Sequence, residues 1–191
     1  MTAFLSHLNM IPYQVFASPA ASIVLPITLG MGVGFSTAQT TKSTYAQIRQ
    51  PPLRPPAAVF GPVWTVLYGL MGYAAHRAYV ATSGPLPTYL SQQDVRALYS
   101  LQLGLNLVWQ PLFFGMRRPA LALADILALV GVNGYLTYSL FQVDEVAGWC
   151  FVPYLAWLSF ATYLNAAVGY LNEWDISDST LAVRAVKDKR M

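Results

Sequence analysis

Long uncharged apolar stretches constrain this chain more than any other feature. No Asp, Glu, Lys or Arg occurs between Met1 and Thr41, and similar apolar stretches recur as far as residue 172. Charged residues make up 10% of the chain, whereas soluble domains carry about 25%. A soluble fold of this size could not bury so much apolar surface, but a bilayer covers it on every side. We therefore expect an integral membrane protein.

Five segments are long enough to cross a bilayer as helices, since a crossing needs about 20 mostly apolar residues. They are 18–39, 57–80, 95–116, 119–141 and 146–172. The pattern predicts an all-α integral membrane fold, a bundle of five transmembrane helices. We expect an N-terminal lead over 1–17, the transmembrane domain over 18–172, and a polar tail over 173–191 that is a short helix or disordered.

The N-terminal region does not fit a secretory signal, because its start is not basic and its apolar run is too long. We interpret it as a short exposed lead followed by a true span. Pro26 should kink the first helix, because proline removes one backbone donor. The connection over 40–56 contains Arg49–Pro56, which fits an Arg-x-x-Pro-x-x-Pro ligand for SH3 domains. Its position directly against a span favours a rigid lead-in to the second helix.

The basic residues predict the orientation, because cytoplasmic loops of membrane proteins are enriched in Lys and Arg. Five crossings leave only Arg77 and Arg96 on one side. The opposite side carries Lys42, Arg49, Arg54, Arg117, Arg118, Arg184, Lys187, Lys189 and Arg190. We expect a cytoplasmic C-terminus and an N-terminus on the far side. The net charge of +3 is explained by these loops, and no basic-aromatic stripe indicates nucleic acid.

Missing motifs argue against three classes of function, namely a metalloenzyme, an ATPase and an ion-coupled pump. No His/Cys/Asp/Glu cluster has metal-ligand spacing, and neither a phosphate-binding loop nor a serine nucleophile motif occurs. The single Cys150 rules out an intramolecular disulfide. Asp125 is the one clear ionisable residue well inside a span, and a proton relay would need more. It is either a polar anchor for a ligand or partner helix, or a near-surface carboxylate paired with Arg117 or Arg118.

Three predicted helices carry aromatic or amide residues on one face. Residues three, four or seven apart share a helical face. If these faces converge, they form a pocket with flat aromatic walls that suits a large, flat, apolar ligand. The alternative is ordinary core packing and an aromatic belt at the headgroups. The three faces comprise Trp64, Tyr68 and Met71; Asn106, Trp109 and Phe113; and Trp157, Ala161 and Leu164.

Asn106 and Asn165 are uncharged polar residues at membrane depth. Such residues usually form hydrogen bonds across helices, so both are expected to join helices, and Asn106 beside Trp109 is also a candidate ligand contact. Small residues four apart, such as Gly30 and Gly34, permit close helix contact within the bundle or across a dimer.

Four sequence motifs follow one another along the chain, on or just before the second to fifth predicted helices. They are YAQIRQP (Tyr45–Pro51) with VFGPVWTVLY (Val59–Tyr68), LNLVWQPLFFG (Leu105–Gly115), ALAD (Ala122–Asp125) and PYLAWLSFATYLN (Pro153–Asn165). This set resembles the translocator protein family, TspO/MBR, also called peripheral-type benzodiazepine receptors. The first span fits by position only. The resemblance implies a five-helix bundle, often a homodimer, in the mitochondrial outer membrane of eukaryotes or the envelope of bacteria.

The family resemblance also implies ligands and site residues. Its members bind tetrapyrroles such as protoporphyrin IX and haem, cholesterol, and synthetic drugs, and no cofactor is required. Its tryptophans that match Trp64 and Trp157 are implicated in porphyrin breakdown by bacterial relatives. The family's pocket residues correspond here to Phe60, Gly61, Val63, Trp64, Asn106, Trp109, Ala124, Trp157, Ala161 and Leu164. The helical faces add Tyr68 and Phe113, and Asp125 is included as a polar candidate, which completes the expected ligand-binding set.

Two departures from the family pattern bear on the ligand. The cholesterol pattern Leu-x-Tyr-x-x-x-Arg has Leu164 here, but Ala166 replaces its Tyr and Tyr170 its Arg. This difference favours tetrapyrroles over sterols. Leu121 also replaces a pocket tryptophan of the fourth helix.

Three functional hypotheses follow. The first is a protein that binds and translocates flat apolar ligands, with Asn106 and a loop cation, Arg49 or Arg54, orienting the ligand. The second is an enzyme that degrades bound porphyrin oxidatively in light. The third is a ligand-free membrane scaffold whose proline-rich loop recruits partners. We favour the first.

Overall fold

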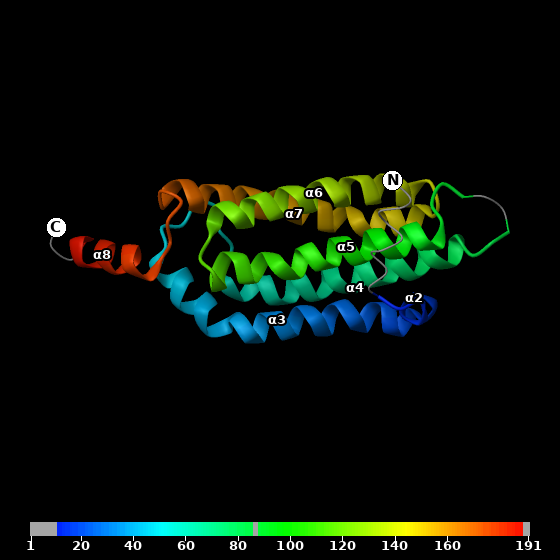
Figure 1. Cartoon of the computed structure of the whole chain (residues 1–191), viewed down its shortest axis with the longest axis horizontal. Helices are drawn as coiled ribbons and strands as arrows, with labels where there is room; N and C mark the ends of the chain where they lie inside the picture. Colours follow the sequence, from blue (N-terminus) through cyan, green and yellow to red (C-terminus); the bar gives the residue numbers. More distant parts are fainter. Residues whose placement is uncertain (1–10, 86–87, 189–191) are drawn as a thin grey trace.

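The computed structural model describes residues 11–85 and 88–188, and every regular element in them is helical. Figure 1 shows the helices along the long axis of the molecule. In chain order they are α2 (Tyr13–Ala17), α3 (Pro19–Gln47), α4 (Ala57–Ala81), α5 (Gln92–Gln110), the π-helix η2 (Pro111–Gly115), α6 (Pro119–Phe141), α7 (Glu145–Leu171) and α8 (Asp178–Asp188).

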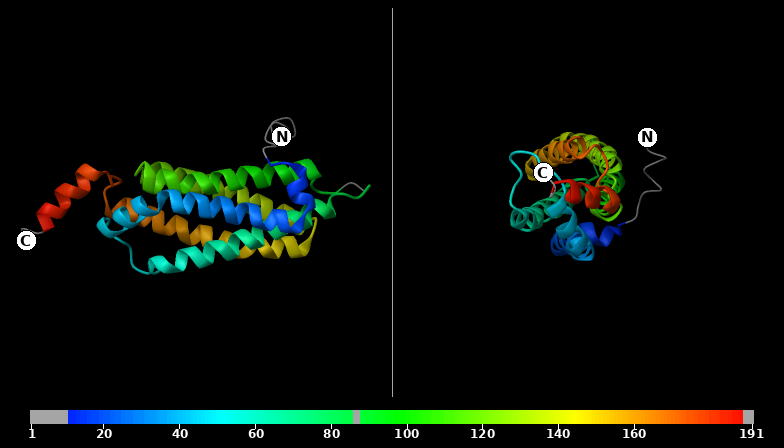
Figure 2. Two further views of the ribbon diagram at one scale, coloured as in Figure 1. Left: turned by 90° about the horizontal axis from the view of Figure 1, so that it is seen from below. Right: turned by 90° about the vertical axis from the view of Figure 1, so that its left-hand side faces the viewer.

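The helices α3 to α7 lie side by side and form one bundle, which Figure 2 shows from the side and from one end. The closest packing joins α6 with α7, α3 with α4, and α4 with α7. The short α2 lies at one end of the bundle, and α8 projects from the other (Figures 1 and 2). The connection between α3 and α4, the turn between α5 and α6, and α8 therefore share one end.

Four helices of the described residues are long and apolar enough to cross a membrane, namely α3, α4, α6 and α7. The chain is thus an integral membrane protein. The third predicted crossing is present as α5, but this helix carries Gln92, Gln93 and Asp94 in its first turn and Gln102 and Asn106 further on. Its composition alone does not qualify it as a span, so the count of five crossings remains a prediction.

The helix ends agree with the predicted spans at α4, α6 and α7 to within one residue. The first helix is longer than predicted, since α3 continues through Pro26 to Gln47, and the connection shortens to 48–56. The helix α5 begins earlier, at Gln92. Ser91 and Asp94 explain that start, because they form a reciprocal capping box that satisfies backbone donors of the first turn.

Both predicted terminal segments contain helical structure where they are described. Residues 1–10 of the lead lie outside the described residues, and its described part contains α2, in which Phe16 is only 1% exposed with its ring edge-on to Tyr99 at 5.5 Å. Phe16 therefore packs this part of the lead onto the bundle. The tail forms α8, in which Leu181 is buried, so the helical alternative applies to residues 178–188.

Glycines bring α3 and α4 into close contact. A Cβ atom on Gly72 would come within 2.1 Å of the Ser22 carbonyl oxygen, and one on Gly30 within 2.2 Å of the Tyr68 ring. Pro26 lies four residues after Ser22 and has no N–H, so it leaves that carbonyl without its helical donor. The α4 backbone at Gly72 covers the same carbonyl.

Two hydrophobic clusters hold the bundle together. The larger one fills the interior between α4, α5, α6 and α7 and includes Met71, which is fully buried. The smaller one lies at the α8 end and joins Ile48 of the first connection, Phe113 of η2 and Leu181 of α8. Trp109 packs against both clusters. Trp109 thus connects the interior with the α8 end, whereas Tyr68 and Met71 belong to the larger cluster.

Candidate functional site

A buried hydrogen-bond triad joins the three predicted faces. The Tyr68 hydroxyl on α4 donates to Asn106 Oδ1 on α5 at 2.6 Å, and Asn106 Nδ2 donates to the Tyr154 hydroxyl oxygen on α7 at 2.9 Å. All three side chains are buried. Because one amide bonds both tyrosines, its two ends are satisfied and the three helices are held in one register. We call these residues the Asn106 triad.

Aromatic rings surround the triad at the contact between α4 and α7. The Trp64 ring centroid lies 5.4 Å from that of Tyr68 and 6.1 Å from that of Tyr154. The Phe60 ring lies 5.8 Å from the Trp157 ring in an edge-on arrangement. Trp64 and Trp157 are only partly buried. Trp64 and Trp157 therefore both lie at the contact of α4 with α7, and their rings already contact aromatic neighbours.

A second aromatic group lies towards the α8 end. The Trp109 ring stacks on Phe113 at 5.2 Å, and its indole N–H donates to Asn165 Oδ1 on α7 at 3.0 Å. Asn165 Nδ2 in turn donates to the Pro119 carbonyl at the start of α6, at 2.9 Å. This confirms that Asn165 bonds across helices. Trp109 is thereby fixed in position between α5, α6 and α7.

The remaining predicted site residues have mixed positions. Ala161 and Val63 pack against the larger cluster, and Leu164 is partly buried. Gly61 is exposed with open space beside it, and Ala124 lies on an exposed part of α6. Gly61 and Ala124 therefore contact neither the Asn106 triad nor its aromatic rings in the described contacts.

Asp125 is partly buried on α6. Its Oδ2 atom is buried and has no hydrogen-bond partner among the described residues. Arg117, one of its two predicted partners, forms an ion pair with Asp178 at the start of α8 instead. The predicted ion pair of Asp125 with Arg117 or Arg118 is therefore not observed among the described residues.

The sequence reasoning did not select Tyr154, although it is fully buried and completes the triad. Two signals could have found it. It lies three residues before Trp157 and so shares its helical face. In addition, a tyrosine hydroxyl at membrane depth usually needs a hydrogen-bond partner.

The first connection is fixed against the end of α7. The Arg49 backbone N–H donates to Asn172 Oδ1 at 3.0 Å, and Asn172 Nδ2 donates to the Arg49 carbonyl at 2.9 Å. The Tyr163 hydroxyl donates to the Pro52 carbonyl at 3.1 Å. The guanidinium of Arg54 lies 5.9 Å above the Tyr45 ring. These contacts support the interpretation of this loop as a rigid connection beside the aromatic residues of α7.

No group of three or more His, Cys, Asp or Glu residues in the described part of the chain could hold a metal ion. The site chemistry there consists of aromatic rings, amides and tyrosine hydroxyls. Such groups bind by stacking and hydrogen bonding, and they offer no obvious nucleophile or acid-base pair.

Comparisons with known proteins agree on one family. The model of the TspO/MBR family matches residues 22–171. A translocator protein homolog of Schizosaccharomyces pombe is 40% identical over 84% of this chain and 98% of its own length. A tryptophan-rich protein TspO of Archaeoglobus fulgidus is 37% identical over 80% of this chain and 95% of its own. The human translocator protein is 37% identical over 78% of this chain and 88% of its own length. The chain is a member of the TspO/MBR family.

Proposed function

We propose that this protein binds and translocates flat apolar molecules between α4, α5 and α7. Tetrapyrroles, protoporphyrin IX or haem, are the preferred ligands, and cholesterol is a further candidate. The observation that carries the proposal is the Asn106 triad with the Trp64 ring against both of its tyrosines. Trp157 follows Tyr154 by three residues on α7 and contacts Phe60 of α4. The names of the relatives, translocator protein and tryptophan-rich protein TspO, favour the same role.

The energetics of such a site are dominated by ring burial. Apolar burial contributes roughly 25 cal/mol per Å², which is enough for micromolar binding of a large planar ligand after the cost of association. The ligand has to separate rings that now touch, such as Phe60 and Trp157, at about 0.5–1.5 kcal/mol for each aromatic pair. Arg49 or Arg54 would orient the propionates of a tetrapyrrole from the first connection.

We also propose five crossings with a cytoplasmic C-terminus. The helix α5 lies alongside the four candidate spans (Figure 1), and its Gln102 and Asn106 side chains are buried in protein, not in lipid. Polar residues of a span are tolerated in that position. The membrane is the mitochondrial outer membrane in a eukaryotic host or the envelope in a bacterial one, and a homodimer is the expected assembly.

An alternative function is oxidative, light-dependent breakdown of a bound porphyrin. The ring contacts between Trp64, Tyr68 and Tyr154 favour it, because tryptophan and tyrosine side chains in contact can exchange electrons with an excited ligand. Illumination of the purified protein with protoporphyrin IX in air would test it. Loss of the porphyrin absorbance with formation of a new product is expected for an enzyme, and an unchanged porphyrin spectrum would leave only binding.

The test of binding is quenching of tryptophan fluorescence in detergent-purified protein by protoporphyrin IX, with cholesterol as a competitor. We expect saturable micromolar quenching that weakens at least several-fold in Trp64→Phe. Trp149→Phe is the matched control, because Trp149 is 60% exposed and lies near the start of α7, outside the proposed site. Equal affinity in wild type and Trp64→Phe would contradict this site. Absence of saturable quenching would contradict the tetrapyrrole assignment, and the sterol would then be tested directly.

A further inference from the structure

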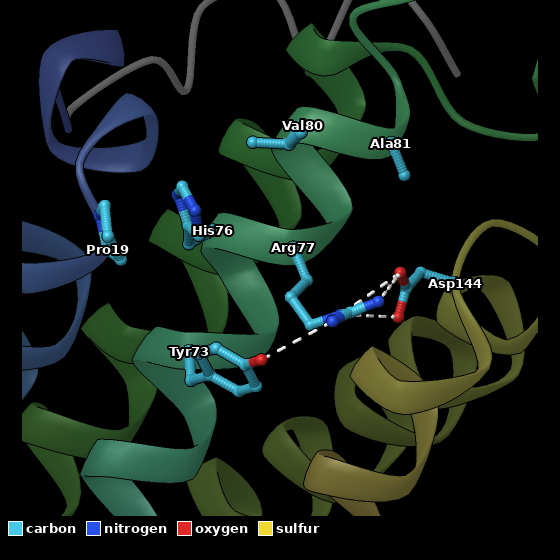
Figure 3. Close-up of a pocket in the computed structure, with 7 residues that line it drawn as sticks. All are labelled: Pro19, Tyr73, His76, Arg77, Val80, Ala81 and Asp144. Atoms are coloured by element: carbon cyan, nitrogen blue, oxygen red, sulfur yellow. Dashed lines mark hydrogen bonds and ion pairs between the residues drawn. The ribbon is translucent and has the colours of Figure 1, made fainter.

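A polar pocket lies on the outward surface of α4, at the end of the bundle opposite α8. Its volume is about 470 Å³, and it is lined by Tyr73, Arg77 and Val80 of α4, Pro19 of α3 and Asp144 before α7, among others. Figure 3 shows Arg77 between Tyr73 and Asp144. This pocket contains none of the residues of the Asn106 triad. It lies where α4 ends and α7 begins, the level at which a spanning helix meets the lipid headgroups.

The pocket presents both signs of charge next to each other. Arg77 Nε and Nη2 donate to the Asp144 carboxylate at 2.7–3.1 Å, and Nη1 donates to the Tyr73 hydroxyl oxygen at a longer 3.4 Å. A guanidinium has five N–H donors, so two remain available, as does the Tyr73 hydroxyl proton. Arg77 is about one-third exposed. An anionic oxygen could therefore bind at Nη1 and Tyr73 while the ion pair stays intact.

A separate apolar groove lies further along α4, from the middle of the helix towards its start. It has a volume of about 300 Å³ and is lined by Pro62, Val66 and Leu70 of α4 and Pro153 of α7, among others, all of them apolar. Leu70 lies seven residues before Arg77, which is about 10 Å along a helix. Val66, Tyr73 and Val80 are all exposed, and their seven-residue spacing puts them on one outward face of α4.

We propose that this combined surface binds one phospholipid with a zwitterionic headgroup. The phosphate accepts hydrogen bonds from Arg77 and Tyr73, the headgroup ammonium faces Asp144, and one acyl chain lies in the groove between α4 and α7. Each half of the site matches one half of such a lipid. The neutral Arg77–Asp144 pair complements a group that carries one negative and one positive charge.

Other occupants match the surface less well. A sterol has a single hydroxyl group, so it would supply neither an anion for the remaining Arg77 donors nor a cation for Asp144. A free phosphate or a soluble phosphocholine would use the pocket but not the groove. An anionic phospholipid would supply the phosphate but place no cation against Asp144.

The direct test is native mass spectrometry of delipidated protein in detergent, titrated with phosphatidylethanolamine. Three further probes separate the contributions: diacylglycerol with the same chains, soluble phosphoethanolamine, and phosphatidylglycerol. We expect one phosphatidylethanolamine per protein, with each of the other probes at least about tenfold weaker, since each lacks a charge-assisted or an apolar contact. Equal retention of diacylglycerol, or equal binding of phosphoethanolamine, would overturn the proposal.

Two pairs of variants test the two halves of the site. Val66→Trp should fill the groove and reduce lipid retention at least severalfold, whereas Leu127→Trp, on an equally exposed part of α6, should not. Asp144 Oδ1 accepts a hydrogen bond from the Ala147 backbone N–H at 2.8 Å at the start of α7. Asp144→Asn keeps an oxygen for that bond but removes the negative charge, so preference should move from phosphatidylethanolamine towards phosphatidylglycerol. Tyr73→Phe should weaken both lipids alike. An unchanged preference in Asp144→Asn, or equal loss in the two tryptophan variants, would overturn the assignment.

Discussion

Two buried amides on α5, one turn apart, show opposite hydrogen bonding. Asn106 bonds a tyrosine at each end of its side chain, whereas neither polar atom of the fully buried Gln102 has a partner among the described residues. Further buried atoms without a partner there include the Tyr99 hydroxyl on α5 and Asn133 Oδ1 on α6. The Asn106 triad therefore fixes how α4, α5 and α7 align, while these unpartnered atoms add no such constraint.

This difference matters because an unmade hydrogen bond costs more than a made one contributes. A buried polar atom without a partner costs about 1–3 kcal/mol, whereas a made hydrogen bond contributes about 0.5–1.5 kcal/mol. Residues of the triad should then be sensitive to substitution, and Gln102 should be tolerant. Three substitutions test this contrast, and a pH dependence extends it to an ion pair at the surface, from the largest expected effect to the smallest.

Asn106→Leu should have the largest effect. It leaves the buried hydroxyls of Tyr68 and Tyr154 without their common partner, so we expect a loss of about 1–3 kcal/mol in the free energy of unfolding. Unfolding in mixed micelles with increasing denaturing detergent measures it. A variant as stable as the wild type would show that the triad does not hold the three helices together.

Trp109→Phe should have a smaller effect. It keeps an aromatic ring against Phe113 but removes the indole N–H that bonds Asn165. We expect a loss of about 1 kcal/mol, measured in the same way. Asn165 still bonds the Pro119 carbonyl, so the loss should stay below that of Asn106→Leu. The reverse order would place the main polar link at the α8 end of the bundle.

Gln102→Leu should be neutral or stabilising by up to about 1 kcal/mol, because a side chain of similar size replaces two unpartnered polar atoms. The matched comparison is Asn106→Leu, which is the same kind of change one turn further along α5. A strongly destabilised Gln102→Leu would mean that Gln102 has a partner outside the chain, such as bound water or ligand, and the contrast between the two amides would then disappear.

The pH dependence of the Arg77–Asp144 pair should be the smallest effect. The Arg77 guanidinium holds the pKa of the Asp144 carboxyl below its usual value, which is about 3.9 for an unperturbed aspartate. The pair then stabilises the fold fully above about pH 4 and loses its contribution as the pH falls through the lower folded pKa. The unfolding temperatures of wild type and Asp144→Asn should therefore converge as the pH falls. An equal difference between the two at every pH would show that the charge of Asp144 does not contribute to stability.

The secondary structure was largely predictable, because the apolar spans and their polar breaks are local properties of the chain. The spans 57–80, 119–141 and 146–172 agree with α4, α6 and α7 to within one residue. The end of α3 was not predictable from hydropathy, since residues 40–47 are polar and remain helical beyond the apolar stretch. Whether α5 can cross the membrane also depends on its neighbours, because its polar residues are acceptable only where other helices cover them.

By itself, the sequence determined that the chain is an all-helical membrane protein with Trp64, Asn106, Trp109 and Trp157 on helical faces, and its motifs placed it in the TspO/MBR family. Helical periodicity is enough for the faces, since it depends only on neighbours along the chain. The tertiary structure alone decided which groups meet across helices, such as Tyr154 with Asn106, Asn165 with Trp109, and Arg77 with Asp144. These pairs depend on the rotation and depth of each helix in the bundle, and no single segment specifies either.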